Sequence, residues 1–178
     1  KAVVQIENDN APGHNAYYPQ IVVDSNGNAT VVWSQAQDDG FGGLVTSIFA
    51  NRYDATNGWD AKAAVPLEND NQPRHNVGLG SPGITLDSNG NAIAVWSQSH
   101  DDGTGRLIHS IFAKRFNAIS GWVTQNTVLN EIDNKINGNA GYPQIAMDSD
   151  RNAIAVWDQS QFDSAGSLVI RIFANRFQ

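Results

Sequence analysis

Cysteine is absent from the 178-residue chain, so disulfides, thiol chemistry and cysteine-based zinc sites are excluded. Basic residues are also few. The eleven Lys and Arg are scattered singly, the formal net charge is −7, and the pI is about 4.8. Because nothing forms a basic stripe that could hold phosphates, we expect no nucleic-acid partner.

Long apolar runs are missing as well. No segment approaches the ~18 residues needed to span a bilayer, and no charged start followed by an apolar stretch marks a signal peptide. We therefore expect no membrane insertion. Little Lys, much Asn and Asp, and no Cys favour an extracellular or cell-surface bacterial protein, whose signal would already have been removed.

Catalytic signatures are also lacking. No Gly-x-Ser-x-Gly or His-Glu-x-x-His motif occurs; His14 and His75 stand in Asn-rich loops, and His100 and His109 are isolated. Glycoside hydrolysis needs two carboxylates in unlike environments, and acyl transfer needs a nucleophile beside a base. Neither arrangement can be identified, so the sequence predicts a protein that is not an enzyme and has no cofactor.

What the sequence does contain is a repeat of about 62 residues. The motif Pro-x-Ile-x-x-Asp-Ser starts at Pro19, Pro82 and Pro143, at spacings of 63 and 61 residues. A tryptophan and an arginine follow in register in every copy. The predicted organisation is a single repeat domain with an N-terminal closing strand at 1–10 and units at 16–72, 80–135 and 141–178.

Each unit reads as four strands. In the first unit we expect strands at Gln20–Asp24, Ala29–Gln35 and Val45–Tyr53, with a weaker fourth at Trp59–Leu67. Asn26-Gly27 between apolar runs is a strong hairpin signal. The first two strands carry apolar residues on both faces, which indicates a sheet covered on both sides.

Stacked sheets of this kind favour a β-propeller of three four-stranded blades over a two-layer sandwich, whose strands would alternate with polar residues. Three blades are fewer than the usual four to eight. Residues 3–9 resemble 64–70 of a fourth strand. We therefore expect a homodimer that completes a six-bladed ring, with the N-terminal strand closing the last blade; the alternative is a fragment of a longer repeat array.

These motifs resemble a known class of repeats. The run from Pro19 to Trp33 resembles the inner hairpin of NHL- and YVTN-type propeller repeats, and Ile-Phe-Ala-Asn-Arg-Tyr with Gly58-Trp59 is similar to repeats of large secreted bacterial proteins. Six-bladed fucose-binding lectins resemble the chain in architecture and in Gly-Trp usage. The Asp-box of sialidases does not fit, because Asp24 and Trp33 are too far apart.

In such a blade the longer loops share one end. Aromatic rings with nearby carboxylates and amides suit sugar recognition, so we expect ligand-binding residues at this end. They are Trp33, Gln35, Asp38, Asp39, Tyr17, Trp96, Gln98, Asp101, Asp102, His75, Asn76, Trp157 and Gln159. The alternative is that the tryptophans are core residues and that the Asp and Asn residues form turns.

The short-turn end holds Asp24 with Arg52, repeated in the other units. Repetition favours a structural ion pair or backbone contacts over a single active site. The Asp24–Asn28 turn also spaces oxygens as a calcium loop does, but it lacks the closing bidentate Glu, so calcium stays a secondary possibility and no metal site is predicted.

The sequence thus predicts a non-catalytic binding module, carbohydrate-binding and lectin-like, with one shallow site per blade. The first alternative is a structural or protein-docking module of a secreted or surface protein. The second is a sialidase-like hydrolase, although that reaction needs three arginines converging on one carboxylate, whereas the repeated arginines belong to separate blades.

Overall fold

The computed structural model describes residues 3–7, 9, 11–60, 64–68, 70–78, 80–123, 127–128 and 138–177. In these residues the regular secondary structure is β-strand alone, and no helix there could cross a membrane. The strand pairs are antiparallel and form three sheets. The all-β prediction is therefore confirmed for the described part of the chain.

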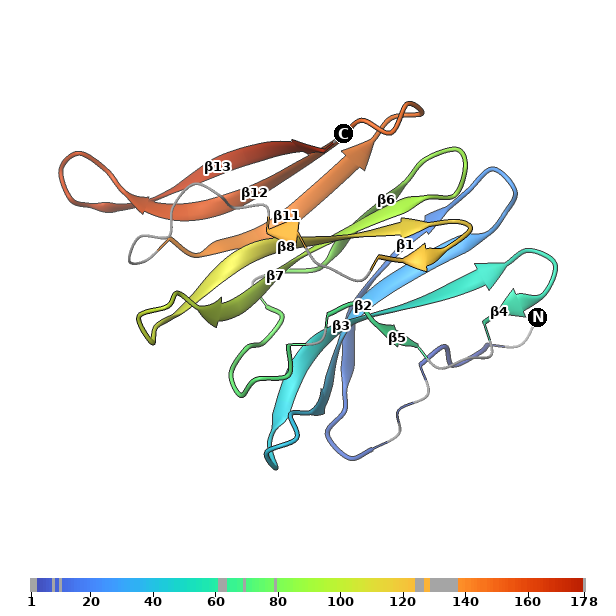
Figure 1. The fold of residues 1–178 in the computed structure, drawn as a ribbon, viewed down its shortest axis with the longest axis horizontal. Helices are drawn as coiled ribbons and strands as arrows, with labels where there is room; N and C mark the ends of the chain where they lie inside the picture. Colours follow the sequence, from blue (N-terminus) through green and yellow to red (C-terminus); the bar gives the residue numbers. More distant parts are fainter. Residues whose placement is uncertain are drawn as a thin grey trace.

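The three sheets follow the three repeats in order (Figure 1). Sheet A contains β1 (Ala16–Val23), β2 (Ala29–Asp38), β3 (Leu44–Asp54), β4 (Gly58–Trp59) and β5 (Val65–Pro66). Sheet B contains β6 (Gly83–Leu86), β7 (Ala92–Asp101), β8 (Leu107–Asn117), β9 (Gly121–Trp122) and β10 (Thr127–Val128). Sheet C contains β11 (Ala140–Met147), β12 (Ala153–Phe162) and β13 (Leu168–Phe177).

An aspartate closes the first hairpin turn of every sheet. In sheet A, Asp24 Oδ1 accepts hydrogen bonds from the backbone N–H groups of Asn26 (2.8 Å) and Asn28 (2.9 Å), and Oδ2 accepts one from the Asn28 side chain (2.8 Å). The same contacts recur at Asp87 and Asp148. The carboxylate thus satisfies turn N–H groups, which accounts for the repeated Asp-Ser-x-x-Asn motif.

The predicted fourth strand exists as two short pieces along β3. β4 pairs with Tyr53 and Asp54, whereas β5 pairs with Phe49 and Ala50. β9 and β10 pair with β8 in the same way in sheet B. Sheet C has three strands in the described residues. The outer edge of each sheet is therefore thin, in keeping with the low apolar content of the segment.

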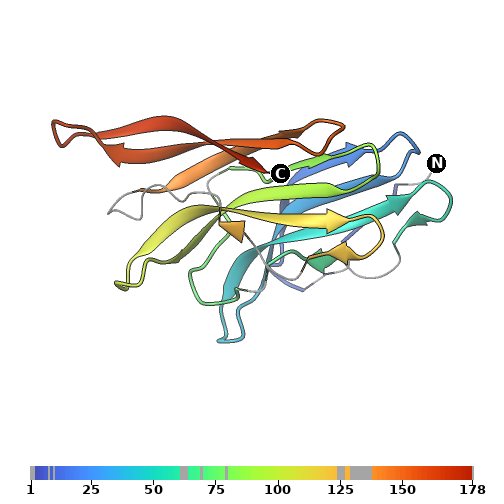
Figure 2. The same ribbon diagram turned by 45° about the horizontal axis from the view of Figure 1, so that its top comes forward.

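Sheet B lies between sheets A and C in both ribbon views (Figure 2). β6 packs on β1 and β2, and β11 packs on β6, β7 and β8. One core joins Val32 and Ile48 of sheet A to Trp96 of sheet B. A second core joins Val95 of sheet B to Trp157 of sheet C. Face-to-face stacking buries apolar residues on both sides of a sheet, as the two-faced apolar pattern predicted.

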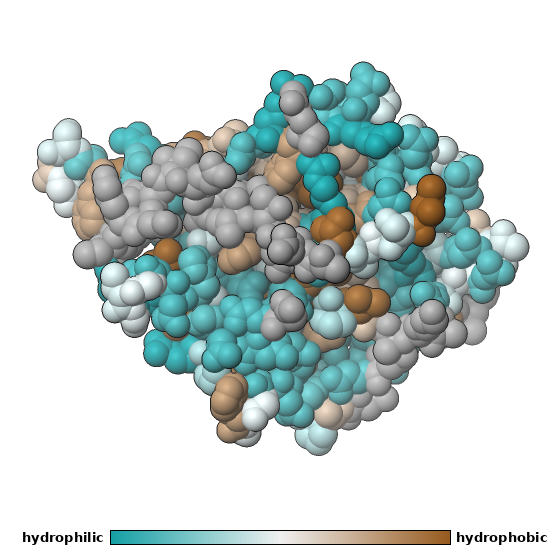
Figure 3. Space-filling model, viewed as in Figure 1, coloured by the Kyte–Doolittle hydropathy of each residue, from teal (hydrophilic) through white to brown (hydrophobic). Residues whose placement is uncertain are grey.

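One face of the molecule is mainly polar. In the view of Figure 3, hydrophilic residues cover most of the coloured surface, and hydrophobic residues appear as separate small groups. The two apolar cores lie between the stacked faces of the sheets.

Candidate functional site

The three repeated tryptophans, which sequence reasoning placed at the ligand site, lie in the core. Trp33, Trp96 and Trp157 are 3%, 0% and 1% exposed. Each indole N–H donates to a buried glutamine two residues further on, at 2.7, 2.9 and 3.2 Å; these acceptors are Gln35, Gln98 and Gln159. Protein covers the ring faces, so the structure supports the core alternative for these six residues.

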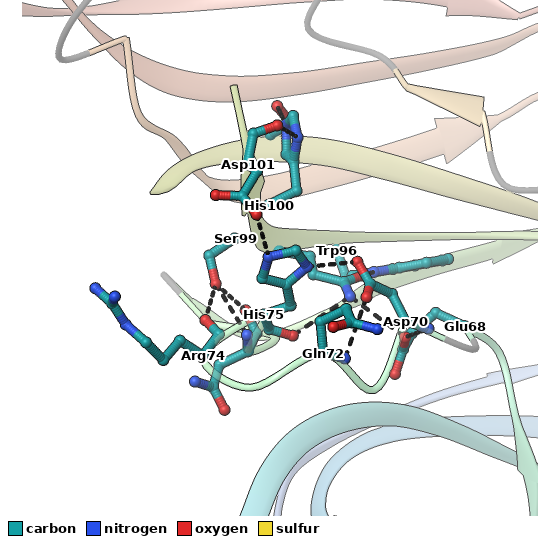
Figure 4. A network of polar contacts seen from close by, with 12 residues as sticks. Glu68, Asp70, Gln72, Arg74, His75, Trp96, Ser99, His100 and Asp101 are labelled. Atoms are coloured by element: carbon teal, nitrogen blue, oxygen red, sulfur yellow. Dashed lines mark hydrogen bonds and ion pairs between the residues drawn. The ribbon is translucent and has the colours of Figure 1, made fainter. Parts of the chain in front are cut away.

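A polar cluster nevertheless forms where the long loop of the second unit meets β7. It consists of Glu68, Asp70, His75, Gln98 and Asp101, and we call it the loop cluster (Figure 4). His75 lies between two carboxylates: its Nδ1 is 2.8 Å from Asp70 Oδ2, and its Nε2 is 3.4 Å from Asp101 Oδ2. The imidazole therefore links the loop to the end of the strand.

Glu68 is the most buried carboxylate of the loop cluster, with 2% of its surface exposed. Its Oε2 accepts hydrogen bonds from the Asp70 N–H (2.7 Å) and the Gln98 side chain (3.3 Å), whereas its Oε1 has no hydrogen-bond partner. Burial raises the pKa of Glu68, and the Ser47 hydroxyl, the Asp70 N–H and the Gln98 amide offset this only in part.

The loop before the first unit repeats the histidine–aspartate contacts of the loop cluster. His14 Nδ1 lies 2.6 Å from Asp9 Oδ2, and its Nε2 lies 3.5 Å from Asp38 Oδ1. The Asp9 N–H donates to Glu7 at 2.9 Å. The hydrogen bond with Asp9 raises the pKa of His14, although burial opposes the shift.

In the third unit, Gly138 stands where the other units have histidine, yet the Gln159 amide still donates to its carbonyl at 3.2 Å. The Gln98 amide meets the His75 carbonyl in the same way at 3.5 Å. The contact common to both units is thus an anchor between loop and strand. The loop cluster thus holds the loop against β7.

The remaining predicted site residues hold turns or join sheets. Asp39 accepts hydrogen bonds from the N–H groups of its own turn, as does Asp102. The Asn76 side chain accepts from the Thr46 N–H (2.8 Å) of sheet A, and its N–H donates to Ser99 (2.9 Å) of sheet B. Tyr17 is exposed on β1, where it lines a hollow with Ile6 and Glu7.

A larger hollow lies at the opposite end, between the short turns of sheets A and B. This turn cleft has a volume of about 610 Å³. That volume is in the range of pockets that bind small ligands. Its lining residues are Asp24, Asn26, Asn28, Arg52, Tyr53, Asp54, Asn57, Gly58, Trp59 and Asp60 from sheet A and its turns, with Asn89, Gly90 and Ala118 from sheet B.

Two aromatic contacts shape the walls of the turn cleft. The Tyr53 and Trp59 rings meet edge to face, with centroids 5.4 Å apart, and both rings are half-buried. The Arg52 guanidinium lies 4.2 Å from the centre of the Phe116 ring of sheet B, a cation–π contact that fixes the cation at the border of the two sheets. Ring surface, a cation and amides therefore converge on one hollow.

The carboxylates of the turn cleft are largely engaged by their own turns. Burial alone would raise the pKa of Asp24, but the hydrogen bonds from the side chain and backbone of Asn28 and from the Asn26 N–H, with the nearby Arg52 charge, hold it below its ordinary value. Asp54 Oδ1 accepts from Thr56 and Asn57. These two groups are fixed turn acceptors.

The equivalent hollow between sheets B and C is far smaller, about 180 Å³. Arg151 occupies the turn position that Gly90 holds in sheet B, and its side chain lines the hollow beside Asp87. Val123 stands where the turn cleft has Asp60, and Phe116 where it has Tyr53. The cleft between sheets A and B is thus open and polar, whereas its copy is filled and apolar.

Sequence reasoning missed the turn cleft because it assigned the short-turn end to structure alone. The sequence signal that could have indicated the turn cleft is that some of its residues differ from those at the same repeat positions in the next unit. Three positions of the turn cleft, Tyr53, Asp60 and Gly90, differ from their counterparts in the neighbouring unit. A feature shared by all units serves the scaffold, whereas a feature of one unit is a candidate for a specific role.

No protein-family model and no curated protein matches the chain, so the NHL and YVTN resemblance has no support from sequence families. Among solved structures, the chain is similar to an endo-arabinase from Bacteroides thetaiotaomicron, with a TM-score of 0.53 and 14% identity. The similarity covers 95% of this chain and 58% of that one, so this chain spans less than two thirds of the enzyme chain. At such low sequence identity, the similarity shows a likeness of the all-β fold alone.

Proposed function

We propose that the chain is a non-catalytic carbohydrate-binding module of an extracellular or cell-surface protein, that its sheets are propeller blades, and that the turn cleft is its ligand site. The observation that supports this most is the coexistence of Tyr53, Trp59 and Arg52 with amides around a hollow of about 610 Å³. The first strands of neighbouring sheets, β1 with β6 and β6 with β11, also pack together, as blades around an axis do.

Sugars need this combination of groups. An aromatic ring covers the apolar face of a pyranose or furanose, and planar amide, carboxylate and guanidinium groups form directional hydrogen bonds with hydroxyls. Trp59 and Tyr53 supply ring surface, and Asn57 and Asn89 supply amides. The neighbouring hollow offers one ring, Phe116, and the amides of Asn91 and Asn117, in a volume of only about 180 Å³.

The charged residues that line the turn cleft favour a neutral glycan over an acidic one. Three aspartates line the turn cleft against one arginine, so an acidic sugar would be repelled. Two of those aspartates, Asp24 and Asp54, are held as hydrogen-bond acceptors of their turns. A pair of carboxylates fixed in this way is poorly suited to exchange a proton with a substrate, which supports binding without hydrolysis.

The test is a glycan array with neutral and acidic oligosaccharides, arabino-oligosaccharides among them, followed by calorimetry with the best ligand. Gly90→Arg copies the filled hollow into the turn cleft, and the third unit already tolerates arginine at this position with φ of 68°. We expect Gly90→Arg to weaken binding at least about tenfold with little change in melting temperature. The matched control, Arg151→Gly, should leave binding intact.

Asp60→Val, which copies Val123, probes the same site without filling it, and it should also weaken binding. Trp59→Ala removes ring surface from the turn cleft and should weaken binding too, with Trp122→Ala in the neighbouring sheet as its control. Binding that survives both Gly90→Arg and Asp60→Val would place the ligand elsewhere. Failure to bind any glycan would refute the carbohydrate proposal. Release of reducing ends from arabinan, abolished by Asp60→Asn, would show that the site is catalytic.

A second candidate, a protein-docking or structural module, is favoured by a separate observation. The outer faces of sheets A and C expose several large aliphatic side chains. Such faces suit contact with another protein surface.

A further inference from the structure

Two sheet faces at opposite ends of the stack carry exposed aliphatic side chains. On sheet C, Ile170 and Ile172 are 71% and 76% exposed, and Ile154 and Val156 lie beside them on β12. On sheet A, Ile21 and Val23 of β1 are 59% and 58% exposed. Clustered aliphatic residues on a strand face usually mark an interface.

Both faces correspond to faces that are already stacked within the chain. Val156 and Ile172 occupy the repeat positions of Val32 and Ile48, which in sheet A pack against Trp96 of sheet B. Ile21 occupies the position of Ile84, which packs into that same core from sheet B. The outer face of sheet C is thus the receiving face of the repeat, and the outer face of sheet A is the inserting face.

The segment before each unit makes contacts that show how the free edge of sheet C can be covered. β5 runs along β3 at Phe49 and Ala50, and Leu67 then inserts beside Trp96 of the next sheet. Ile6 occupies the position of Leu67, and the Asn51 side chain donates to its carbonyl at 2.7 Å, as Lys114 does to the Leu67 carbonyl.

The residues just before Ile6 correspond to β5. Val4 and Gln5 stand at the repeat positions of Val65 and Pro66, and Val3 and Val4 are exposed. In the described residues, β13 has β12 as its one strand partner, so its other edge corresponds to the edge of β3 that holds β5.

We infer that the outer face of sheet C docks on the outer face of sheet A of a second copy, with Val4 and Gln5 of that copy pairing with β13. The contact is head to tail, and such a contact closes into a ring or continues as an open filament, depending on its rotation. Propellers close with four to eight blades, and six is the one multiple of three in that range. Blade number thus favours a closed dimer of six sheets for copies that carry three sheets each.

The second copy also completes a third hollow. Asp148, Asn152 and Arg176 of sheet C line an open depression of about 530 Å³ that has no facing sheet in the described residues. In the dimer, Gly27 of the second copy faces it at the position that Gly90 holds in the turn cleft. A glycine there keeps the hollow open, whereas Phe177 stands where the turn cleft has Tyr53.

Sedimentation equilibrium and native mass spectrometry at micromolar concentration test the assembly without any ligand. We expect a species of twice 19.2 kDa. Ile172→Asp should convert it to a 19.2 kDa monomer, and so should Ile21→Asp on the complementary face. Ile119→Asp is the matched control, because Ile119 is equally aliphatic and exposed but lies in a turn away from both faces.

Engineered cysteines then test the pairing, which is simple because the chain has none. Val4 stands where Val65 pairs with Ala50, and Ala174 is the counterpart of Ala50. The double variant Val4→Cys/Ala174→Cys should oxidise to a covalent dimer, and each single variant should not. A monomer, a ladder of longer covalent oligomers, or a dimer unaffected by Ile172→Asp and Ile21→Asp would each overturn the closed dimer, whether or not glycans bind.

Discussion

Arg151 Nε lies 3.5 Å from Asp87 Oδ2, so the turn of sheet C reaches across to the turn of sheet B. At the equivalent position Gly90 leaves the space beside Asp24 open. A Cβ built on Gly90 would sit 3.4 Å from Asp24 Oδ2, a close but tolerable contact. This turn position is thus one of three that distinguish the open cleft from its filled copy.

Asp87→Ala should lower the free energy of unfolding by about 1–3 kcal/mol, because the Asn89 and Asn91 N–H groups lose their acceptor. Arg151→Ala should cost less, about 0–1 kcal/mol, since the arginine side chain is exposed. Urea denaturation compares the two. Equal losses would mean that the ion pair, rather than the turn, carries the contribution of Asp87.

Trp96→Ala should lower the free energy of unfolding by about 3–5 kcal/mol, because it empties the core between sheets A and B. The matched control is Ile119→Ala, at an exposed turn, which should change stability by less than about 0.5 kcal/mol. Guanidinium denaturation followed by circular dichroism measures both. A folded Trp96→Ala variant of unchanged stability would show that the ring is not a core residue.

Glu68→Gln should raise stability by about 1 kcal/mol at neutral pH, because it removes a buried charge and keeps an oxygen for the Asp70 N–H. The folded-state pKa of Glu68 is raised, so the free energy of unfolding of the wild type increases relative to that of the variant as pH falls. The advantage of Glu68→Gln should therefore be full above the folded pKa and vanish below the ordinary glutamate pKa.

Urea melts of both proteins from pH 7 down to pH 4 measure this difference, with Glu7→Gln as the matched control. A Glu68→Gln variant less stable than the wild type at neutral pH would mean that an ionised Glu68 has a partner that stabilises it.

The His14 imidazole should titrate above the ordinary histidine pKa of 6.5, because its hydrogen bond with Asp9 favours the protonated form. A raised folded-state pKa means that His14 contributes stability that is full below pH ~6.5 and is lost as pH rises through the folded pKa. NMR titration of the ring protons measures it. Asp9→Asn should lower the His14 pKa, and an unchanged value would exclude the contact in solution.

The repeat, the strands and the hairpin turns could be predicted because their causes are local. Asp24 and Asn28 lie in one turn, and the burial of Val32 can be predicted from its position in an apolar strand. The turn cleft could not, since Gly90 and Trp59 come together only when two sheets stack. The fourth strand was placed correctly along β3 but predicted as continuous, because its weak pattern gave no sign of the break between β4 and β5.

The linear stacking of the sheets has a consequence for how the molecule comes apart. Sheet B is covered on both faces, whereas sheets A and C are each covered on one. In such arrays each layer is stabilised by its contacts with the adjacent layers, so the outer sheets, with one neighbour each, should unfold locally before the middle sheet. Amide protons of β13 should therefore exchange with deuterium faster than those of β7, and docking of a second copy should slow β13 most.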